Sequence, residues 1–267
     1  MSQSIEEIPV IILCGGRGTR MGSLTDKTPK ALILIQGEAI IWYIIQSLYI
    51  EGFRRFILPL GYKGEMIQKY VEKHLSNMPG IQIKCLDTGE NTNIAKRVST
   101  VIQQEKFDSE ILLLNSDAIF DFSLSDKYHK HIFSRKFITL ISVAIHSQWG
   151  LILENETQIK GFVRDHKVQY FVSSTDEGYR GYIYSGMAFI NKNILDQIDL
   201  TNSQNFENDL YSNSIESAQL GNEKADGFWF SIDTPKDISK LNNENSRAGS
   251  HLKAIRESIS GFLEIQK

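Results

Sequence analysis

The stretch Val10–Met21, which reads VIILCGGRGTRM, combines two features that indicate an α/β fold. Its first four residues form a short apolar run rich in β-branched side chains, which is typical of a strand buried on both faces of a parallel sheet. Three glycines follow within four positions, at Gly15, Gly16 and Gly18, and let the backbone turn sharply after the strand. We therefore expect a parallel sheet with a tight loop at the carboxyl end of its first strand.

Short apolar strands and helical patterns alternate through the first half of the chain. This alternation predicts a doubly wound α/β domain with a mostly parallel sheet and right-handed crossovers. The expected strands are residues 10–13, 55–60, 81–86 and 111–114, and the expected helices are residues 39–49, 66–75 and 94–104.

The second half of the chain is less regular. Residues 150–163 are typical of a small β-hairpin around the polar turn Asn155–Thr157, and further strands are expected at residues 139–144, 182–190 and 228–230. The tail carries apolar residues at helical spacing, at Leu252, Ile255, Ile259 and Leu263. We expect one domain over residues 1–240 and a C-terminal helical appendage over residues 241–267. The apolar stripe of this tail would pack on its own domain or on a neighbouring subunit of a homo-oligomer.

Composition excludes several classes of protein. The 267 residues carry 29 Lys and Arg against 32 Asp and Glu, a net charge of −3, and 41% are hydrophobic, which is globular composition. No basic stripe with interleaved aromatic residues is visible, so no nucleic-acid partner is expected. No apolar run approaches the roughly 20 residues that span a bilayer, so we expect no membrane partner and a cytoplasmic location. Two cysteines are too few for a disulfide framework.

The glycine loop has the chemistry of a phosphate site. Without Cβ atoms in the way, its N–H groups can approach a ligand closely, while Arg20 offers a planar fork for phosphate oxygens and Lys30 a compact charge. A glycine turn with two solvated basic residues is the alternative. The loop lacks the spacing of a Walker A motif and of a dinucleotide-binding fingerprint.

Two acids follow expected strands. Asp117 comes directly after the strand at residues 111–114, and Asp233 comes after the strand at residues 228–230. Ligands of open α/β sheets bind outside the carboxyl ends of the strands, and Mg²⁺ takes one or two carboxylates there with water and phosphate oxygens. The alternative for each acid is a cap of the next element. Asp237, after a proline, is expected to be an acid in the first turn of a helix.

The stretches Gly15–Met21, Leu24–Thr25 and Pro29–Leu32 resemble the signature of the sugar-1-phosphate nucleotidyltransferases. The resemblance implies a Rossmann-like nucleotidyltransferase fold over residues 9 to 240, an Mg²⁺ cofactor held by Asp117 and Asp233, and catalytic roles for Arg20 and Lys30. It also implies a nucleotide site made of Leu13, Gly15, Gly16, Gly18, Thr19, Arg20, Lys30, Thr92, Arg97 and Ser116.

A third set of motifs concerns the nucleotide base. Leu60–Gly64, Asp87–Thr92 and Arg97 resemble the glucose-1-phosphate cytidylyltransferase branch of the family, which makes CTP the first choice of nucleotide. From the residues alone, a glycine turn stabilised by an aspartate is as plausible as a base-binding loop. A second resemblance is about as good: Trp149-Gly150 and residues 228–237 resemble a guanylyltransferase branch that acts on heptose or mannose phosphates.

The acceptor half departs from the family pattern. Ile159–Val163 resembles the strand that leads, in the family, into a Glu-Lys pair that binds the sugar hydroxyls and the phosphate, but Arg164-Asp165-His166-Lys167 follows here. Arg164 or Lys167 would supply the phosphate-binding cation, or both are solvated turn residues. Tyr184-Ser185-Gly186 stands where the family has Asn-Ala-Gly or Asn-Gly-Gly, so the resemblance assigns these three residues to the acceptor too.

These observations predict a Mg²⁺-dependent nucleotidyltransferase that moves CMP from CTP to a phosphorylated acceptor, such as a sugar 1-phosphate, and releases pyrophosphate. No general base is needed, because the acceptor phosphate is already ionised at neutral pH. Besides the guanylyltransferase, a catalytically silent nucleotide-binding regulator is the alternative from another class, since the acceptor motifs are altered.

Overall fold

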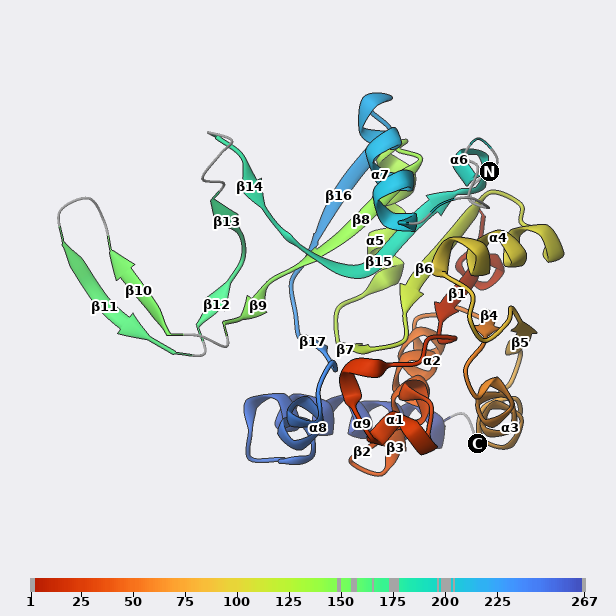
Figure 1. Ribbon diagram of the computed structural model, residues 1–267, viewed down its shortest axis with the longest axis horizontal. Coiled ribbons are helices and arrows are strands. Elements are labelled where there is room, and N and C mark those ends of the chain that lie inside the picture. The colour runs from red at the N-terminus through yellow and green to blue at the C-terminus, as the bar shows by residue number, and fades with distance from the viewer. Residues whose placement is uncertain are drawn as a thin grey trace.

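A central seven-stranded sheet organises the chain in the computed structural model, which describes residues 3–147, 150–154, 158–164, 166–172, 178–195, 197, 203 and 205–265 (Figure 1). The strand order is β16-β8-β15-β6-β1-β4-β5. The strands are β1 (Pro9–Leu13), β4 (Arg55–Leu60), β5 (Gln82–Asp87), β6 (Glu110–Asn115), β8 (Ile138–Val143), β15 (Ile183–Asn191) and β16 (Leu220–Ala225).

All neighbouring strands of this sheet are parallel except β15, which runs antiparallel to both β6 and β8. The predicted doubly wound, mostly parallel α/β fold is therefore confirmed. Because β1 pairs with β4 and β6 in parallel, the loops that follow these strands meet at one edge. The glycine loop after β1 and Asp117 after β6 consequently lie at the same edge of the sheet.

Strand β1 is buried on both faces, as its apolar run predicts. Val10 and Ile12 belong to one core cluster, while Ile11 belongs to a second cluster on the opposite face. Helices α4 (Ile94–Gln104) and α7 (Phe206–Glu216) cover the second face. The first face is covered by α2 (Ile40–Ile50), α3 (Gly64–His74), α5 (Leu124–Ser134), α8 (Pro235–Asn242) and α9 (Arg247–Ile265).

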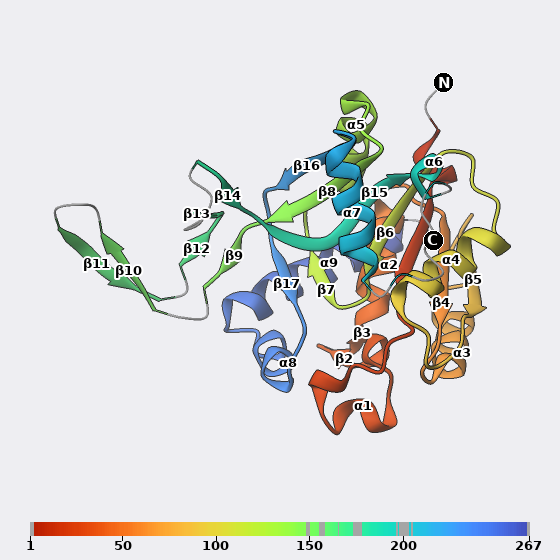
Figure 2. The ribbon, with the colours of Figure 1, turned by 45° about the horizontal axis from the view of Figure 1, so that its top comes forward.

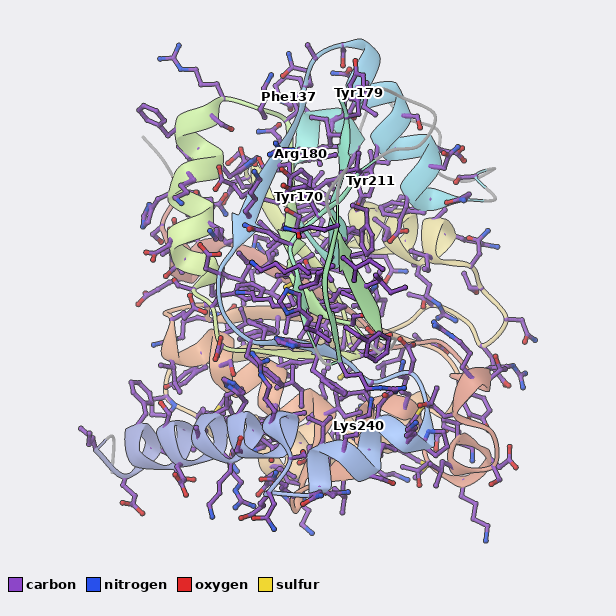
Figure 3. The ribbon with its side chains drawn as sticks, turned by 90° about the vertical axis from the view of Figure 1, so that its left-hand side faces the viewer. Phe137, Tyr170, Tyr179, Arg180, Tyr211 and Lys240 are labelled. Carbon is purple, nitrogen blue, oxygen red and sulfur yellow. The ribbon has the colours of Figure 1, made fainter. Side chains whose placement is uncertain are left out.

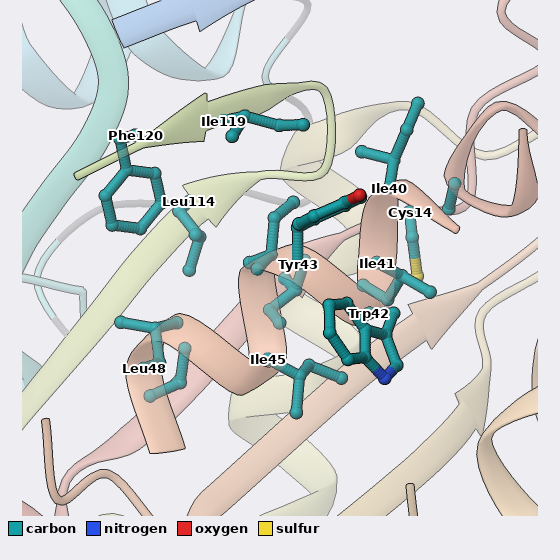
Figure 4. Packing of buried hydrophobic residues seen from close by; sticks show 14 of the residues in the cluster. Cys14, Ile40, Ile41, Trp42, Tyr43, Ile45, Leu48, Leu114, Ile119 and Phe120 are labelled. Carbon is teal, nitrogen blue, oxygen red and sulfur yellow. The ribbon is translucent and has the colours of Figure 1, made fainter. Parts of the chain in front are cut away.

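Helix α2 lies inside the first core. Ile40, Ile41, Tyr43 and Ile45 are all at most 1% exposed, so apolar residues surround the helix rather than forming one stripe. Figure 4 shows this helix beside Leu114 of β6 and Ile119 and Phe120 of β7 (Ala118–Phe120), which lie on one side of it. The helix also packs against the 3-10 turn Lys30–Leu32, which carries Lys30.

The tail forms two helices, α8 and α9, where the apolar spacing predicts one helix from residue 241 onward. Leu252 and Ile259 of α9 are buried in the same core cluster as α2, against which α9 packs. The apolar stripe therefore packs on its own chain, which is the first of the two positions expected for it; the other was a neighbouring subunit. The division of the chain at residue 240 falls inside α8 and stays a prediction.

A chain of short strands projects from the sheet between β8 and β15, and we call residues 145–181 the arm (Figure 1 and Figure 2). The predicted hairpin is confirmed, because β10 (Leu151–Glu154) and β11 (Ile159–Val163) pair in antiparallel fashion. Its expected turn, Asn155–Thr157, and Trp149 lie outside the described residues. The arm also contains β9 (Ile145–His146), β12 (Lys167–Val168), β13 (Phe171–Val172) and β14 (Arg180–Gly181).

The remaining short elements connect these layers. They are β2 (Leu34–Ile35), β3 (Glu38–Ala39), β17 (Trp229–Ser231), α1 (Leu24–Lys27), α6 (Lys192–Leu195) and the 3-10 turns Ile5–Glu7, Thr19–Met21 and Lys30–Leu32. Within the described residues, no helix is long and apolar enough to cross a membrane.

Candidate active site

A pocket of about 620 Å³ lies at the carboxyl ends of β1 and β6. Its walls come from the glycine loop, the start of α4, the loop after β6 and the start of α7. The predicted site residues in its lining are Leu13, Gly15, Gly16, Gly18, Arg20, Lys30, Thr92, Arg97, Ser116 and Asp117. The fold thus brings together residues that are widely separated in sequence.

The glycines of the loop have different structural roles. A Cβ on Gly15 would lie 2.5 Å from the Arg97 guanidinium and 2.9 Å from the carbonyl oxygen of Pro59, so only glycine fits there. Gly18 has a φ of +65°, a conformation that favours glycine. A Cβ on Gly16 would meet nothing within 4 Å. Gly16 therefore faces open space, where a ligand can approach the backbone.

Lys30 lies between the two predicted acids. Its ammonium nitrogen is 2.9 Å from Asp117 Oδ2 and 3.4 Å from Asp233 Oδ1, and its side chain is only 13% exposed. Arg20 approaches the same Asp233 Oδ1 at 2.9 Å from the solvent side. Two cations and two carboxylates therefore converge at the edge of the pocket.

Asp233 reaches this cluster through a strand pairing. Strand β17 pairs in antiparallel fashion with β7, and the N–H of Ile232 donates to the carbonyl of Asp117 at 2.8 Å. Burial opposes the ionisation of Asp233. The hydrogen bond from Ser231 (2.6 Å) and the charges of Lys30 and Arg20 together outweigh burial, so the pKa of Asp233 is lowered. The arrangement therefore holds Asp233 as a carboxylate.

Arg97 is buried behind the glycine loop, where it organises the segment after β5. It donates to the carbonyl of Leu60 (2.9 Å), to Thr88 Oγ1 (2.6 Å) and to the carbonyl of Glu90 (3.2 Å). Burial lowers the pKa of its guanidinium. Asp87 Oδ1 accepts from the N–H of Gly89 at 2.9 Å. This is the glycine turn stabilised by an aspartate that the sequence suggested as the alternative to a base-binding loop.

Comparison with known proteins identifies the family of this chain. The sequence matches the nucleotidyl transferase family over residues 9–247. The chain belongs to this family. It is 28% identical over 252 residues to a protein of Bacillus subtilis (strain 168) named "Probable glucose-1-phosphate cytidylyltransferase", covering 87% of this chain and 94% of the relative.

A second relative, the "Mannose-1-phosphate guanyltransferase beta-A" of Xenopus laevis, is 30% identical over 233 residues. The match covers 85% of this chain but only 62% of that relative. Among solved structures, HddC from Yersinia pseudotuberculosis superposes with a TM-score of 0.61 at 19% identity and covers 89% of this chain and 99% of that one. That likeness supports the nucleotidyl transferase fold alone.

Two residues of the predicted nucleotide set shape the loops of this transferase. Ser116 is buried, and its hydroxyl donates to the carbonyl of Leu13 at 2.8 Å, which joins the ends of β6 and β1. Thr19 begins the 3-10 turn after the loop and does not belong to the pocket lining. Its carbonyl accepts from the N–H of Gly22 at 3.1 Å.

Asp117 and Asp233 fit a divalent cation in donor chemistry. Both are carboxylates, which Mg²⁺ prefers, and both already face one cation in Lys30. The described residues contain no group of three or more His, Cys, Asp or Glu side chains that could hold a metal ion. Asp237 is not in this pair, because its Oδ2 accepts from the N–H groups of Asp233 and Thr234 at the start of α8, as the sequence predicts.

None of the five predicted acceptor residues is in the pocket lining. Tyr184 and Ser185 are in β15, where their hydroxyl groups bond to Tyr211 and to the carbonyl of Ile141, each at 2.8 Å. Gly186 has a φ of +80°, and a Cβ there would lie 2.6 Å from Asn115 Nδ2.

Arg164 and Lys167 are exposed residues of the arm. The Arg164 guanidinium lies 5.6 Å from the centroid of the Phe162 ring, and Lys167 pairs with His146 between β12 and β9. A similar contact, 4.6 Å long, joins the guanidinium of Arg180 in β14 to the ring of Tyr170, and both residues are labelled in Figure 3. The assignment of Arg164 and Lys167 to the acceptor stays a prediction.

Several residues that line the pocket were not predicted from the sequence. Asn205, Phe206 and Glu207 begin α7 and form one wall of the pocket, and Asn93 begins α4 on the opposite wall. Each asparagine accepts from a backbone N–H three residues later, a capping pattern that the sequence could have revealed. That both helix starts face one pocket is visible only in the folded chain.

Proposed function

We propose that this nucleotidyl transferase moves CMP from CTP to a sugar 1-phosphate and releases pyrophosphate. The observation that carries the proposal is the cluster of Lys30, Arg20, Asp117 and Asp233 at the edge of a pocket that begins at a glycine loop. The names of the two relatives support the substrate class, because both contain a hexose 1-phosphate.

The chemistry follows from this distribution of charge. A phosphate oxygen of the acceptor attacks the α-phosphorus of the nucleotide in line, a new P–O bond forms, and the bond to pyrophosphate breaks. The attacking oxygen is already ionised, so the protein contributes position and charge rather than a base. The N–H groups of the loop near Gly16 approach the phosphates, and Arg20 and Lys30 offset their negative charge.

Asp117 and Asp233 are the residues that would hold Mg²⁺ in this proposal. The ion, when bound, supplies charge neutralisation on the phosphate oxygens. Lys30 would then turn from the two carboxylates toward the substrate phosphates, since its ammonium group now lies where these carboxylates converge.

The choice of CTP rests on the segment from Asp87 to Thr92 and on the cytidylyltransferase relative. A guanylyltransferase that acts on mannose 1-phosphate is the second candidate, because the guanyltransferase relatives match at similar identity. Both candidates use the same phosphate cluster and differ in the base.

Purified protein would be incubated with Mg²⁺, each of the four ribonucleoside triphosphates, and either glucose 1-phosphate or mannose 1-phosphate, and pyrophosphate would be followed. We expect release with CTP and glucose 1-phosphate to exceed the other pairs by at least about tenfold. Fastest release with GTP and mannose 1-phosphate would favour the second candidate. Tight CTP binding without pyrophosphate release for any acceptor would favour the silent regulator.

A further inference from the structure

The pocket has two walls that belong to different halves of the sheet. The glycine loop and the start of α4 lie over β1, β4 and β5, whereas α7 lies over β15 and β8 (Figure 1 and Figure 2). Asp117, which follows β6, stands between the two halves. If the nucleotide lies on the glycine loop, the α7 wall faces the space on the acceptor side.

Glu207 is an unexpected residue in this wall. Besides Asp117, it is the only acid among the described residues that line the pocket. A carboxylate repels phosphate but accepts hydrogen bonds from hydroxyl groups. Glu207 therefore suits a neutral, hydroxyl-bearing part of a ligand.

A pair of tyrosines lies behind Glu207. The hydroxyl groups of Tyr184 in β15 and Tyr211 in α7 are 2.8 Å apart, and the two rings meet edge to face at 5.7 Å. Burial is the main cause that raises the pKa of each tyrosine, and the charge of Glu207 raises each pKa further. Tyr211 follows Glu207 by four residues in α7, so the two side chains lie on the same face of this helix.

The start of α7 is held in place from several sides. Asn93 Nδ2 donates to the carbonyl of Ser203 at 3.0 Å, and Ser203 Oγ donates to Asp209 Oδ2 at 2.7 Å. Asn205 Oδ1 accepts from the N–H of Asn208 at 3.1 Å. These bonds fix the wall that carries Glu207 relative to α4, so Glu207 has a defined place beside the pocket.

We propose that Glu207, positioned by the Tyr184–Tyr211 pair, binds ring hydroxyl groups of the acceptor and makes the enzyme select a sugar phosphate over a phosphate ester without hydroxyl groups. This inference rests on the proposed function and deepens it. It assigns to α7 the hydroxyl recognition for which the segment after Val163 has no glutamate.

The test compares Glu207→Gln with Glu65→Gln. Both are glutamates in the first turn of an 11-residue helix, but Glu65 lies in α3, outside the pocket. With the preferred hexose 1-phosphate, we expect Glu207→Gln to raise the acceptor KM about tenfold, because the neutral amide oxygen of Gln accepts weaker hydrogen bonds than a carboxylate does. The KM for CTP should stay within about twofold, and Glu65→Gln should leave both constants unchanged.

Cyclohexyl phosphate serves as a matched acceptor that lacks ring hydroxyl groups. Wild-type protein should use the hexose 1-phosphate much better than cyclohexyl phosphate, and Glu207→Gln should reduce that preference about tenfold. Equal losses for the two acceptors, or a rise in the KM for CTP instead, would overturn the proposal. Tyr211→Phe should raise the hexose 1-phosphate KM less than Glu207→Gln does, with kcat retained, because Tyr211 only positions the carboxyl group.

Equilibrium binding separates this proposal from the proposed function. If no nucleotide and acceptor release pyrophosphate, calorimetry with glucose 1-phosphate and mannose 1-phosphate in the presence of CTP still measures the acceptor site. Weaker binding to Glu207→Gln than to Glu65→Gln would support the role of Glu207 even though transfer had failed. Equal binding to the two variants, or no binding to the wild type, would contradict it.

Discussion

The two walls of the pocket are built in different ways. The glycine-loop wall comes from one short segment that directly follows β1, and its cations, Arg20 and Lys30, lie within 20 residues of that strand. The α7 wall, which carries Glu207, is bonded to β15 through Tyr211 and Tyr184. It is bonded to the start of α4 through Ser203 and Asn93, and Asn93 lies far away in sequence. A wall built from one continuous segment has a sequence motif that can be recognised. A wall built from several separate segments has no such motif, and its residues can be substituted one at a time.

This contrast has a functional meaning. Every nucleoside triphosphate presents the same triphosphate group, so the wall that faces this group can remain constant, while acceptors differ in the ring that carries the phosphate. The residues that depart from the family pattern, at Arg164, Lys167 and Tyr184, all belong to the acceptor half. The experiments below test how far the two halves are independent.

Asp117→Asn should produce the largest effect, because Asp117 lies between the two walls. The substitution keeps the size of the side chain and removes one of the two charges that face Lys30. We expect Mg²⁺-dependent pyrophosphate release to be abolished, measured as a titration of rate against Mg²⁺ concentration. Asp126→Asn, at an exposed position in α5, is the control. An unchanged titration would remove Asp117 from the metal site.

Lys30→Ala should lower kcat by about 100-fold to 1,000-fold, the range seen when one preorganised charge or donor is removed. The variant also leaves Asp117 and Asp233 facing each other without a cation between them. Pyrophosphate release measures the effect, and a thermal melt checks that the protein is folded. Lys27→Ala, an exposed lysine in the neighbouring α1, should behave as the wild type. Near-normal turnover of Lys30→Ala would exclude a catalytic role.

Gly15→Ala and Gly16→Ala form a matched pair within the glycine-loop wall. A Cβ at residue 15 would collide with Arg97 and with the Pro59 carbonyl, so we expect a loss of about 1–3 kcal/mol in the free energy of unfolding. A Cβ at residue 16 meets nothing, so stability should stay within about 0.5 kcal/mol while CTP binding weakens. Denaturant unfolding and calorimetric titration with CTP measure the two effects. Equal stability of both variants would contradict the close packing around Gly15.

Most of the sheet and of the glycine-loop wall could be predicted from the sequence, because the patterns that indicate them are local. The strand at residues 10–13, the glycines after it and the acid after β6 each lie within a few positions of the pattern that predicts them. Asp233 is predicted from its position after a strand and from the family resemblance, but no local signal places it beside Asp117. Its place beside Asp117 depends on the pairing of β17 with β7, which joins segments about a hundred residues apart.

Glu207 illustrates what the sequence could not supply. The capping pattern at Asn205 predicts a helix start, but no local signal says that this start meets the start of α4 at the mouth of a pocket. That contact depends on β15 running antiparallel between β6 and β8, which brings α7 back onto the same face as α4. Local patterns therefore predict a helix start, and only the topology of the sheet decides what that helix start faces.

The smallest effect is expected from the arm. Arg164→Ala and Lys167→Ala remove exposed cations that lie outside the pocket lining, and the contact of Arg164 is with Phe162 of the same hairpin. We therefore expect the acceptor KM to change by less than about twofold for each variant, because an exposed charge contributes little free energy to an interaction. Steady-state pyrophosphate release at varied hexose 1-phosphate measures it, with Lys84→Ala, in β5, as the control.

A rise of tenfold or more in the acceptor KM, confined to Arg164→Ala or Lys167→Ala, would contradict that expectation. It would mean that the arm folds over the acceptor side when substrate binds, so that the cation predicted from the sequence reaches the sugar phosphate after all. Combining the more sensitive of these variants with Glu207→Gln would then be informative. Effects that multiply would place the arm and the α7 wall at separate parts of the acceptor, whereas effects that do not multiply would indicate that both hold the same group.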